Sequence, residues 1–230
     1  MRAYIELEEV ELLEKAATNL RDRLLVRLLF RLGCRISEAL AIRVEDIDFN
    51  QGTVAINHLK ERIRLSCPNC GTRLSKASKY CPECSKKINQ VTRDKLELHR
   101  RRILPIETDT LEVLREYIDR SGPVNRNGQL LIFGINRHRA WQIIKQCADE
   151  AGLPNLVNTE TGKVHHVSPH RLRDAFAVNA VKHDDSGDGL RMLQEHLGHQ
   201  SISTTMRYRK VAGEEHREWY DKLWNKEDIE

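Results

Sequence analysis

Residues 197–208 read Leu197-Gly198-His199-Gln200-Ser201-Ile202-Ser203-Thr204-Thr205-Met206-Arg207-Tyr208, and this stretch says more about the fold than any other. We predict helices over residues 187–197 and 201–210, so that His199 lies at their junction and Tyr208 on the second helix. A tyrosine becomes a covalent nucleophile when its proton is removed or its oxyanion is stabilised. The stretch therefore offers a histidine and a candidate nucleophile on adjoining helices.

Two upstream motifs supply arginines, and they read Gly33-Cys34-Arg35-Ile36-Ser37-Glu38 and His170-Arg171-Leu172-Arg173. His170 and Arg173 are three residues apart, so they share one helix face. Arg35 opens a helix directly after a glycine turn, and a helix N-terminus favours anions. Because the planar arginine fork matches phosphate oxygens, the three motifs together suit chemistry on a phosphodiester.

Composition sets weaker limits. The chain has 230 residues, 40% hydrophobic and 31% charged, with a net charge of only +4. Such a mild excess says little about nucleic acid by itself, although Lys and Arg gather over 93–102, 137–145 and 207–210. No stretch approaches the length of a membrane span, and the first residues lack the features of a secretory signal. We therefore expect a cytoplasmic protein without a membrane partner, in which cysteines are thiols or metal ligands.

Hydrophobic periodicity and turn residues predict an α+β fold, mainly helical, with one small antiparallel sheet. A hairpin is expected over 46–57, with one strand continuing to residue 65 and a second returning over 102–106. A further short strand is expected over 130–133. Pro169 occupies the favoured first turn of a helix. The predicted helices cover 6–17, 20–32, 37–44, 108–120, 136–151, 169–182, 187–197, 201–210 and 213–225.

Four cysteines form two CxxC pairs, Cys67-Pro68-Asn69-Cys70 and Cys81-Pro82-Glu83-Cys84. Four thiolates from two such turns match a tetrahedral zinc site. Both pairs have the same form and neither opens a thioredoxin-like βαβ unit, which disfavours a redox role. Four protein ligands leave no open position, so we predict one structural zinc per chain. Cys34 and Cys147 stand alone and are expected to be buried apolar thiols.

Four motifs resemble, in this order and spacing, those of the catalytic domain of the tyrosine recombinases, the phage integrase family. They are the two arginine motifs, Leu197-Gly198-His199, and the ending Thr204-Thr205-x-x-Tyr208. The resemblance covers roughly residues 5–225, with only the cysteine-bearing segment outside it. We therefore expect a tyrosine recombinase catalytic domain over 1–230, with a four-cysteine zinc ribbon over 66–90 inserted in its β-hairpin. The family's N-terminal core-binding domain is expected to be absent, because residues 4–9 already look like the opening of the catalytic domain. A minimal enzyme and a fragment of a longer protein both fit.

The resemblance implies a mechanism of site-specific DNA cleavage and rejoining. Tyr208 would attack the scissile phosphate and form a 3′-phosphotyrosyl intermediate. Arg35 and Arg173 would clamp the non-bridging oxygens, His199 would donate a further hydrogen bond, and His170 would assist removal of the tyrosine proton. The phosphodiester energy stays in the covalent link, so neither ATP nor a catalytic metal is expected.

The family also uses a hairpin lysine to protonate the 5′-oxygen. Residues 51–60 resemble the strand that ends in this lysine, and 100–106 resemble the returning R-x-x-P strand. Lys60 is therefore the expected general acid. Lys95 is the alternative, because the cysteine-bearing insert displaces the hairpin tip.

The resemblance further implies a double-stranded DNA partner, dimers to tetramers on DNA through a tail helix within 214–225, and association with the nucleoid. The zinc ribbon would either contact DNA, pack on a neighbouring protomer, or only close the hairpin. Two other functions stay open: a catalytically silent zinc-containing DNA-binding regulator, and type IB topoisomerase-like relaxation. The intact nucleophile and arginines disfavour the first, and chain size with the Leu-Gly-His motif disfavours the second. A DNA contact made by the zinc ribbon would use five basic residues of that segment: Arg73, Lys76, Lys79, Lys86 and Lys87.

Overall fold

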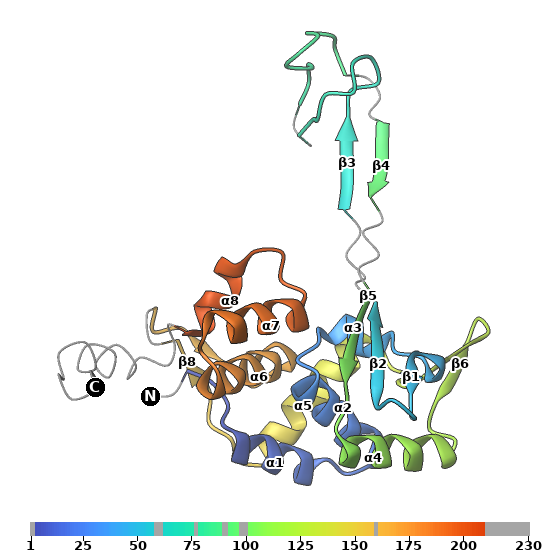
Figure 1. Ribbon diagram of the computed structural model, residues 1–230, viewed down its shortest axis with the longest axis vertical. Helices are drawn as coiled ribbons and strands as arrows, with labels where there is room; N and C mark the ends of the chain where they lie inside the picture. The colour runs from blue at the N-terminus through green and yellow to red at the C-terminus, as the bar shows by residue number, and fades with distance from the viewer. Residues whose placement is uncertain are drawn as a thin grey trace, which may run out of the picture. The chain divides into compact units, whose positions relative to one another are not determined.

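The computed structural model describes residues 3–57, 62–75, 78–88, 92–96, 101–158 and 161–209 (Figure 1). The chain divides into two compact units. The larger unit combines Met1–Ile56 with Arg102–Glu230, and the smaller unit is Asn57–Arg101. The segment carrying the four clustered cysteines thus forms a unit of its own within the chain.

The N-terminal part consists of helices α1 (Leu7–Ala16), α2 (Leu20–Arg31) and α3 (Ile36–Leu40), followed by the 3-10 turn η1 (Val44–Asp46). The side chain of Asn19 caps α2 by accepting a hydrogen bond of 2.9 Å from the backbone N–H of Asp22. The helix predicted over 37–44 is wrong at its end. It stops at Leu40, and Arg43 instead pairs with Asp46 across η1.

Gly33 fixes the path of the chain into the first arginine motif. Its φ of 52° lies in the left-handed region, which favours glycine. A Cβ there would also lie 2.4 Å from Cδ1 of Phe176, a side chain of helix α6 (Pro169–His183). Only glycine therefore lets this turn approach α6 closely enough to bring the first and second arginine motifs together.

The sheet of the larger unit has the order β1-β2-β5, formed by Ile47–Asp48, Thr53–Asn57 and Arg101–Pro105. The predicted hairpin is confirmed, with Ile47 opposite Val54. The predicted returning strand is also confirmed, although residues 58–61, between β2 and β3, lie outside the described part. In the smaller unit β3 (Arg62–Ser66) pairs antiparallel with β4 (Thr92–Leu96).

The rest of the larger unit is mostly helical (Figure 1). The strand predicted over 130–133 begins one residue earlier and pairs with a strand that was not predicted. A second unpredicted pair precedes α6. The predicted helix over 213–225 lies outside the described residues. The elements are α4 Thr108–Asp119, β6 Val124–Arg126, β7 Gln129–Leu131, α5 Arg137–Glu150, β8 Leu156–Val157, β9 Val164–His165, α6 Pro169–His183, α7 Gly187–Leu197 and α8 Ile202–Arg209.

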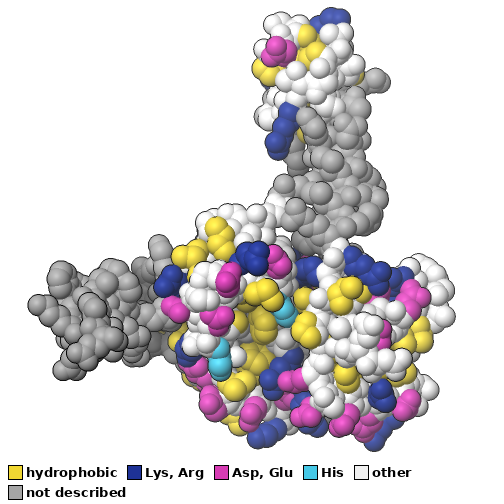
Figure 2. Space-filling model, in the orientation of Figure 1, with side chains coloured by type: hydrophobic (Ala, Val, Ile, Leu, Met, Phe, Trp, Pro, Cys, Tyr) yellow, Lys and Arg dark blue, Asp and Glu magenta, His cyan; other side chains and the backbone are white. Residues whose placement is uncertain are grey.

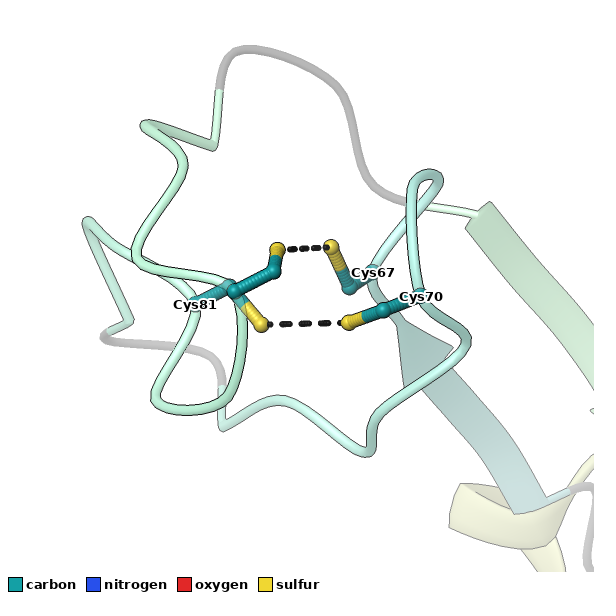
Figure 3. Close-up of side chains that lie close together, drawn as sticks. Cys67, Cys70 and Cys81 are labelled. Carbon is teal, nitrogen blue, oxygen red and sulfur yellow. Dashed lines mark hydrogen bonds between the residues drawn. The ribbon is translucent and has the colours of Figure 1, made fainter.

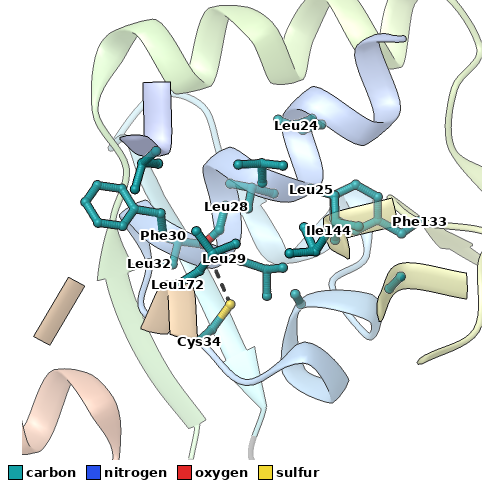
Figure 4. Packing of buried hydrophobic residues seen from close by; sticks show 14 of the residues in the cluster. Leu24, Leu25, Leu28, Leu29, Phe30, Leu32, Cys34, Phe133, Ile144 and Leu172 are labelled. Atoms are coloured by element: carbon teal, nitrogen blue, oxygen red, sulfur yellow. Dashed lines mark hydrogen bonds between the residues drawn. The ribbon is translucent and has the colours of Figure 1, made fainter. Parts of the chain in front are cut away.

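Helix α2 lies at the centre of the main hydrophobic core (Figure 4). Its leucines Leu24, Leu25, Leu28 and Leu29 are at most 1% exposed, and each such burial contributes about 1.5–3 kcal/mol. A second cluster joins α6 to α7 through Ala177, Val181, Leu190, Leu193 and Leu197, with Tyr208 packed against it. The two clusters hold α3, α6, α7 and α8 in place, and these elements carry the four motifs.

Candidate active site

The four motifs meet at one cavity of about 940 Å³. Its lining comes from the N-terminal end of α3, one face of α6, and the α7–α8 junction, with a contribution from β9 and α5. Among the described lining residues there are five arginines and three histidines but a single carboxylate. On the face drawn in Figure 2, by contrast, acidic and basic side chains are interspersed. The lining residues that concern the chemistry are Arg35, Arg137, His165, His170, Arg171, Arg173, Asp174, His199, Arg207 and Tyr208.

Arg173 ties three motifs together. The residue is only 3% exposed, and its Nη1 donates to the carbonyl of Gly33 at 2.7 Å while Nη2 donates to that of Leu197 at 2.8 Å. Nη2 also lies 3.1 Å from Nε2 of His199. Burial and the charge of Arg35 lower the pKa of Arg173, but a guanidinium keeps its charge in proteins. A permanent cation is thus fixed against the backbone of two other segments.

Arg35 is the N-cap of α3 and is oriented by Glu38. Nη1 of Arg35 donates to Glu38 at 2.9 Å, and its backbone N–H donates to the same carboxylate at 3.0 Å. Arg102 of β5 donates to Glu38 from the other side at 2.8 Å. Burial alone would raise the pKa of Glu38, but the Arg35 backbone N–H and the charges of Arg102 and Arg35 hold it below its usual value. Neither Glu38 nor Arg102 had been assigned a role from the sequence.

His199 is held at both ring nitrogens. Nδ1 lies 3.0 Å from the hydroxyl of Thr205, a fully buried residue of α8, and Nε2 faces Arg173. Burial and the charge of Arg173 lower the pKa of His199 to about 4, so the ring is neutral near pH 7. Because a guanidinium can only donate, Nε2 accepts here and the proton sits on Nδ1. The predicted donation to phosphate requires Thr205 to become the donor, which frees Nε2 to carry the proton.

Gly198 allows His199 to enter the site. Its φ of 66° ends α7 in the left-handed region. A Cβ at this position would lie 2.3 Å from Nη1 of Arg102. The left-handed backbone conformation therefore favours glycine in the Leu-Gly-His motif, and a side chain here would also displace the guanidinium of Arg102.

Tyr208 projects from α8 toward α6. Its hydroxyl donates to Oδ1 of Asp174 at 3.1 Å, and its ring stacks on that of His199 with centroids 6.2 Å apart. Burial and the neighbouring charge of Asp174 raise the pKa of Tyr208 well above its ordinary value. The Tyr208 phenol is thus protonated near pH 7, so it could act as a nucleophile only with a proton acceptor.

His170 lies at the mouth of the cavity, with a side chain 70% exposed. Its Nδ1 is 3.5 Å from Oδ1 of Asp174. The other oxygen, Oδ2, accepts from Nη1 of Arg171 at 2.8 Å. His170 and Arg173 do line the same cavity, as expected from their spacing, although one is exposed and the other buried. Asp174 was missed, and the only signal for it was its position four residues after His170.

The side chains of both candidate general acids, Lys60 and Lys95, lie outside the described part of the structure. Lys60 lies outside the described residues, and Lys95 is described only as a backbone position of β4, paired with Ile63. Among the described lining residues of the cavity there is no lysine.

The four cysteines of the smaller unit form one cluster, with all sulfurs within 4.8 Å of one another. The Sγ atoms of Cys67 and Cys84 are 3.7 Å apart. Those of Cys70 and Cys81 are 3.5 Å apart and point toward each other (Figure 3). All four are free thiols. This donor set can hold a metal ion.

The two CxxC turns have the same backbone pattern. The N–H of Gly71 bonds the carbonyl of Cys67, and the N–H of Ser85 bonds that of Cys81, at 2.9 and 3.0 Å. Gly71 has φ 72° and Ser85 has φ 54°, so the serine occupies a conformation that favours glycine. The repeat of one turn geometry brings the two pairs of sulfurs to a common point.

Within the described residues, no helix combines the length and apolar character needed to cross a bilayer.

The arginines, histidines and tyrosine of this cavity suit chemistry on a phosphodiester, and comparison with known proteins places the chain in a family. The chain belongs to the phage integrase family, whose model matches residues 4–215. It is 31% identical over 206 residues to tyrosine recombinase XerC of Roseiflexus sp. (strain RS-1), covering 90% of this chain and 52% of that protein. The chain thus spans about half the length of such relatives.

Solved structures share the fold. The crystal structure of XerA recombinase matches with a TM-score of 0.63 at 20% identity, covering 98% of this chain and 66% of that one. The integrase of transposon Tn1549, in complex with transposon right end DNA, matches with a TM-score of 0.58 at 14% identity, covering 96% and 66%. The expected tyrosine recombinase catalytic fold, mainly helical, is confirmed. One small antiparallel sheet was expected, but the described residues form one three-stranded and three two-stranded sheets.

Proposed function

We propose that the chain is the catalytic domain of a site-specific DNA recombinase that cuts and rejoins strands through a 3′-phosphotyrosyl intermediate. The observation that carries this is the convergence of Arg35, Arg173, His199 and Tyr208 on one cavity with five arginines in its lining. Permanent cations that face a common space stabilise the extra negative charge of a pentavalent phosphate. A double-stranded DNA partner follows, and the Tn1549 integrase, described as bound to DNA, supports it.

In this proposal each residue has one task. Tyr208 attacks phosphorus, while Arg35 and Arg173 bind the non-bridging oxygens. His199 donates from Nε2 once the phosphate draws Nη2 of Arg173 away and the Thr205 hydroxyl donates to Nδ1. His170 assists removal of the tyrosine proton. The reaction keeps the phosphodiester energy in the phosphotyrosine, so it needs no ATP and no catalytic metal.

Protonation of the leaving 5′-oxygen is assigned to Lys60, with Lys95 as the alternative. A lysine ammonium is a mobile point donor on a long stem, which suits delivery from a hairpin. Cleavage of DNA with a 5′-bridging sulfur separates the two candidates, because a thiolate leaves without protonation. The true general acid is the lysine whose change to alanine slows cleavage of normal DNA but not of the sulfur-bridged DNA.

A nicked suicide substrate tests the central proposal, because the cleaved strand diffuses away and traps the covalent complex. We expect the unaltered chain to be captured and Tyr208→Phe to bind DNA without capture. Tyr117→Phe is the matched control, since Tyr117 is a buried tyrosine whose hydroxyl bonds only the carbonyl of Gly122 among the described residues, at 2.9 Å. Capture by Tyr208→Phe, or none by the unaltered chain, would contradict the proposal. Two-site strand exchange and supercoil relaxation then distinguish a recombinase from a topoisomerase.

We also propose that the cysteine cluster holds one structural zinc. In a tetrahedral site with Zn–S bonds of about 2.3 Å, neighbouring sulfurs are about 3.8 Å apart, which agrees with the cross-turn distances of 3.7 and 3.5 Å. Among the described residues of the smaller unit, the apolar cluster consists of cysteines, Leu74 and a few partly buried neighbours, so the metal would supply much of the stability there. Elemental analysis should find one zinc per chain and less in Cys70→Ser. Zinc-free purified protein would contradict this.

The zinc ribbon, residues 66–90 between β2 and β5, is proposed to add a DNA contact. Arg73, Lys79 and Lys87 are exposed there, and Lys86 is held by Asn69 at 2.8 Å. Lys76 lies outside the described residues. Removing one cation that binds a phosphate should reduce the salt dependence of binding by about one unit of slope. An unchanged slope in an Arg73→Gln/Lys79→Gln/Lys87→Gln variant would instead favour packing on a neighbour or simple closure of the hairpin. Dimers to tetramers on DNA and residence with the nucleoid complete the proposal.

A further inference from the structure

Asp174 is the single carboxylate among the described lining residues of a cavity that otherwise presents arginines and histidines. A carboxylate beside a phosphate site opposes phosphate binding by like-charge repulsion. Its presence therefore calls for a compensating role. The position of Asp174 indicates which one, because it contacts the nucleophile itself.

The two carboxylate oxygens have different partners. Oδ2 accepts from Nη1 of Arg171 at 2.8 Å, which pins the group. Oδ1 accepts the hydroxyl of Tyr208 at 3.1 Å and lies 3.5 Å from Nδ1 of His170. Asp174 is thus inserted between the phenol and the exposed imidazole, and Oδ1 is the atom common to both.

Other bases in the described lining are less suited to take the proton. His199 has both nitrogens engaged, by Thr205 and Arg173. His170 is separated from the phenol by the carboxylate, since the hydrogen bond described for the Tyr208 hydroxyl goes to Asp174. The charged and titratable groups facing Asp174 are Tyr208 from α8, His165 from β9, and His170 and Arg171 from its own helix.

We propose that Asp174 is a catalytic residue that accepts the proton of Tyr208 during attack and exchanges it with His170 at the cavity mouth. The inference rests on the proposed function. As the bond from the phenol oxygen to phosphorus forms, the bond to the 5′-oxygen breaks, and the phenol proton moves to Oδ1. The leaving oxygen takes a separate proton from the general acid. In the rejoining step Asp174 returns its proton to the phenol oxygen.

This role explains how the cavity tolerates an acid. Protonation neutralises Asp174 at the moment when the phosphate gains negative charge, so the repulsion present at rest disappears in the transition state. Binding that improves only in the transition state raises the rate of the chemical step. If Asp174 only formed an ion pair with Arg171 on the same helix, it would keep its negative charge throughout the reaction and would continue to repel the phosphate.

Single-turnover cleavage of DNA with a 5′-bridging sulfur tests the proposal, because the leaving thiolate needs no general acid. The unaltered chain should cleave at a rate that changes little between about pH 7 and 9. Asp174→Asn should be slower by about 100-fold or more, with a rate that rises with pH as hydroxide replaces the lost base. Formate should restore part of the rate of Asp174→Ala, which checks the proposal even if the asparagine variant folds poorly.

The outcomes are separable. Unchanged or faster cleavage by Asp174→Asn overturns the proposal. The hydrogen bond from Tyr208 to Asp174 would then only hold the tyrosine in place before DNA binds. A slow variant with the pH profile of the unaltered chain, and no response to formate, overturns it in favour of a structural ion pair. If the unaltered chain itself never cleaves, the proposed function fails, and the inference fails with it.

Discussion

Glu38→Gln probes the buried acid that joins two arginines. Its carboxylate, 1% exposed, holds Arg102, 11% exposed, and Arg35, 39% exposed. Glutamine keeps the shape but removes the charge and turns an N–H group toward a guanidinium. Breaking a buried pair by removing one partner costs about 3–5 kcal/mol, whereas the half-exposed pair adds at most about 1 kcal/mol. We expect the free energy of unfolding to fall by about 3 kcal/mol, which is a large part of the roughly 5–15 kcal/mol typical of a folded domain.

The assay is urea unfolding of the larger unit at pH 7, with Arg102→Met and the double variant completing a cycle. Nε and Nη1 of Arg102 have no hydrogen-bond partner among the described residues. The double variant should therefore have a free energy of unfolding at least about 1 kcal/mol higher than the sum of the two single effects predicts. A cost below about 1 kcal/mol, or additive single variants, would refute the reasoning.

The same pair predicts a pH dependence. The folded-state pKa of Glu38 is lowered, so its contribution is complete above the ordinary glutamate pKa of about 4.3. It is lost as pH falls through the lowered folded value. Stability of the unaltered chain should therefore decline below about pH 4.5 more steeply than that of Glu38→Gln. Parallel acid profiles would contradict the assignment.

Three further predictions concern single positions. Thr205→Val removes the hydrogen bond to Nδ1 of His199 and should slow covalent capture of the suicide DNA by about tenfold or more. Thr205→Ser keeps the hydroxyl and should retain most of the rate. Equal rates for the two variants would contradict a role for Thr205 in orienting His199. Gly198→Ala should lower stability by at least about 1–3 kcal/mol in thermal melts because of its left-handed φ and the approach of Arg102; an unchanged melting temperature would contradict this. Ser85→Gly should strengthen the cysteine turn by up to about 1 kcal/mol, seen as slower metal loss to a chelator, and faster loss would disprove it.

The sequence predicted most of the helical fold because long apolar stripes fix a helix and its buried face. The leucines of α2 recur at helical spacing and are buried, and the caps and glycines mark its ends. The failures are short elements. Helix α3 ends at Leu40 because Arg43 pairs with Asp46, a local competition that periodicity does not reveal. The hairpin β8–β9, two residues on each side, is too short for an alternating pattern.

The motif residues were predictable because their types and spacing are distinctive. The residues that contact and orient them were not predictable. Asp174 meets Tyr208 across 34 positions of chain, and Arg102 meets Glu38 across 64. Neither pair shares a local pattern, and both arise only when α6, α8, β5 and α3 pack together. The tautomer of His199 is equally hidden, since it depends on which nitrogen meets a guanidinium.

The two backbone contacts of Arg173 have a consequence for safety. Its guanidinium is fixed by carbonyls at Gly33 and Leu197, residues from the two ends of the larger unit. In a nascent or partly unfolded chain these carbonyls are apart, so the charge that would attract a phosphate to the tyrosine is not assembled. Under the proposed function, the capacity to cut DNA would therefore arise only on folding, because it would depend on the same contacts as the native state.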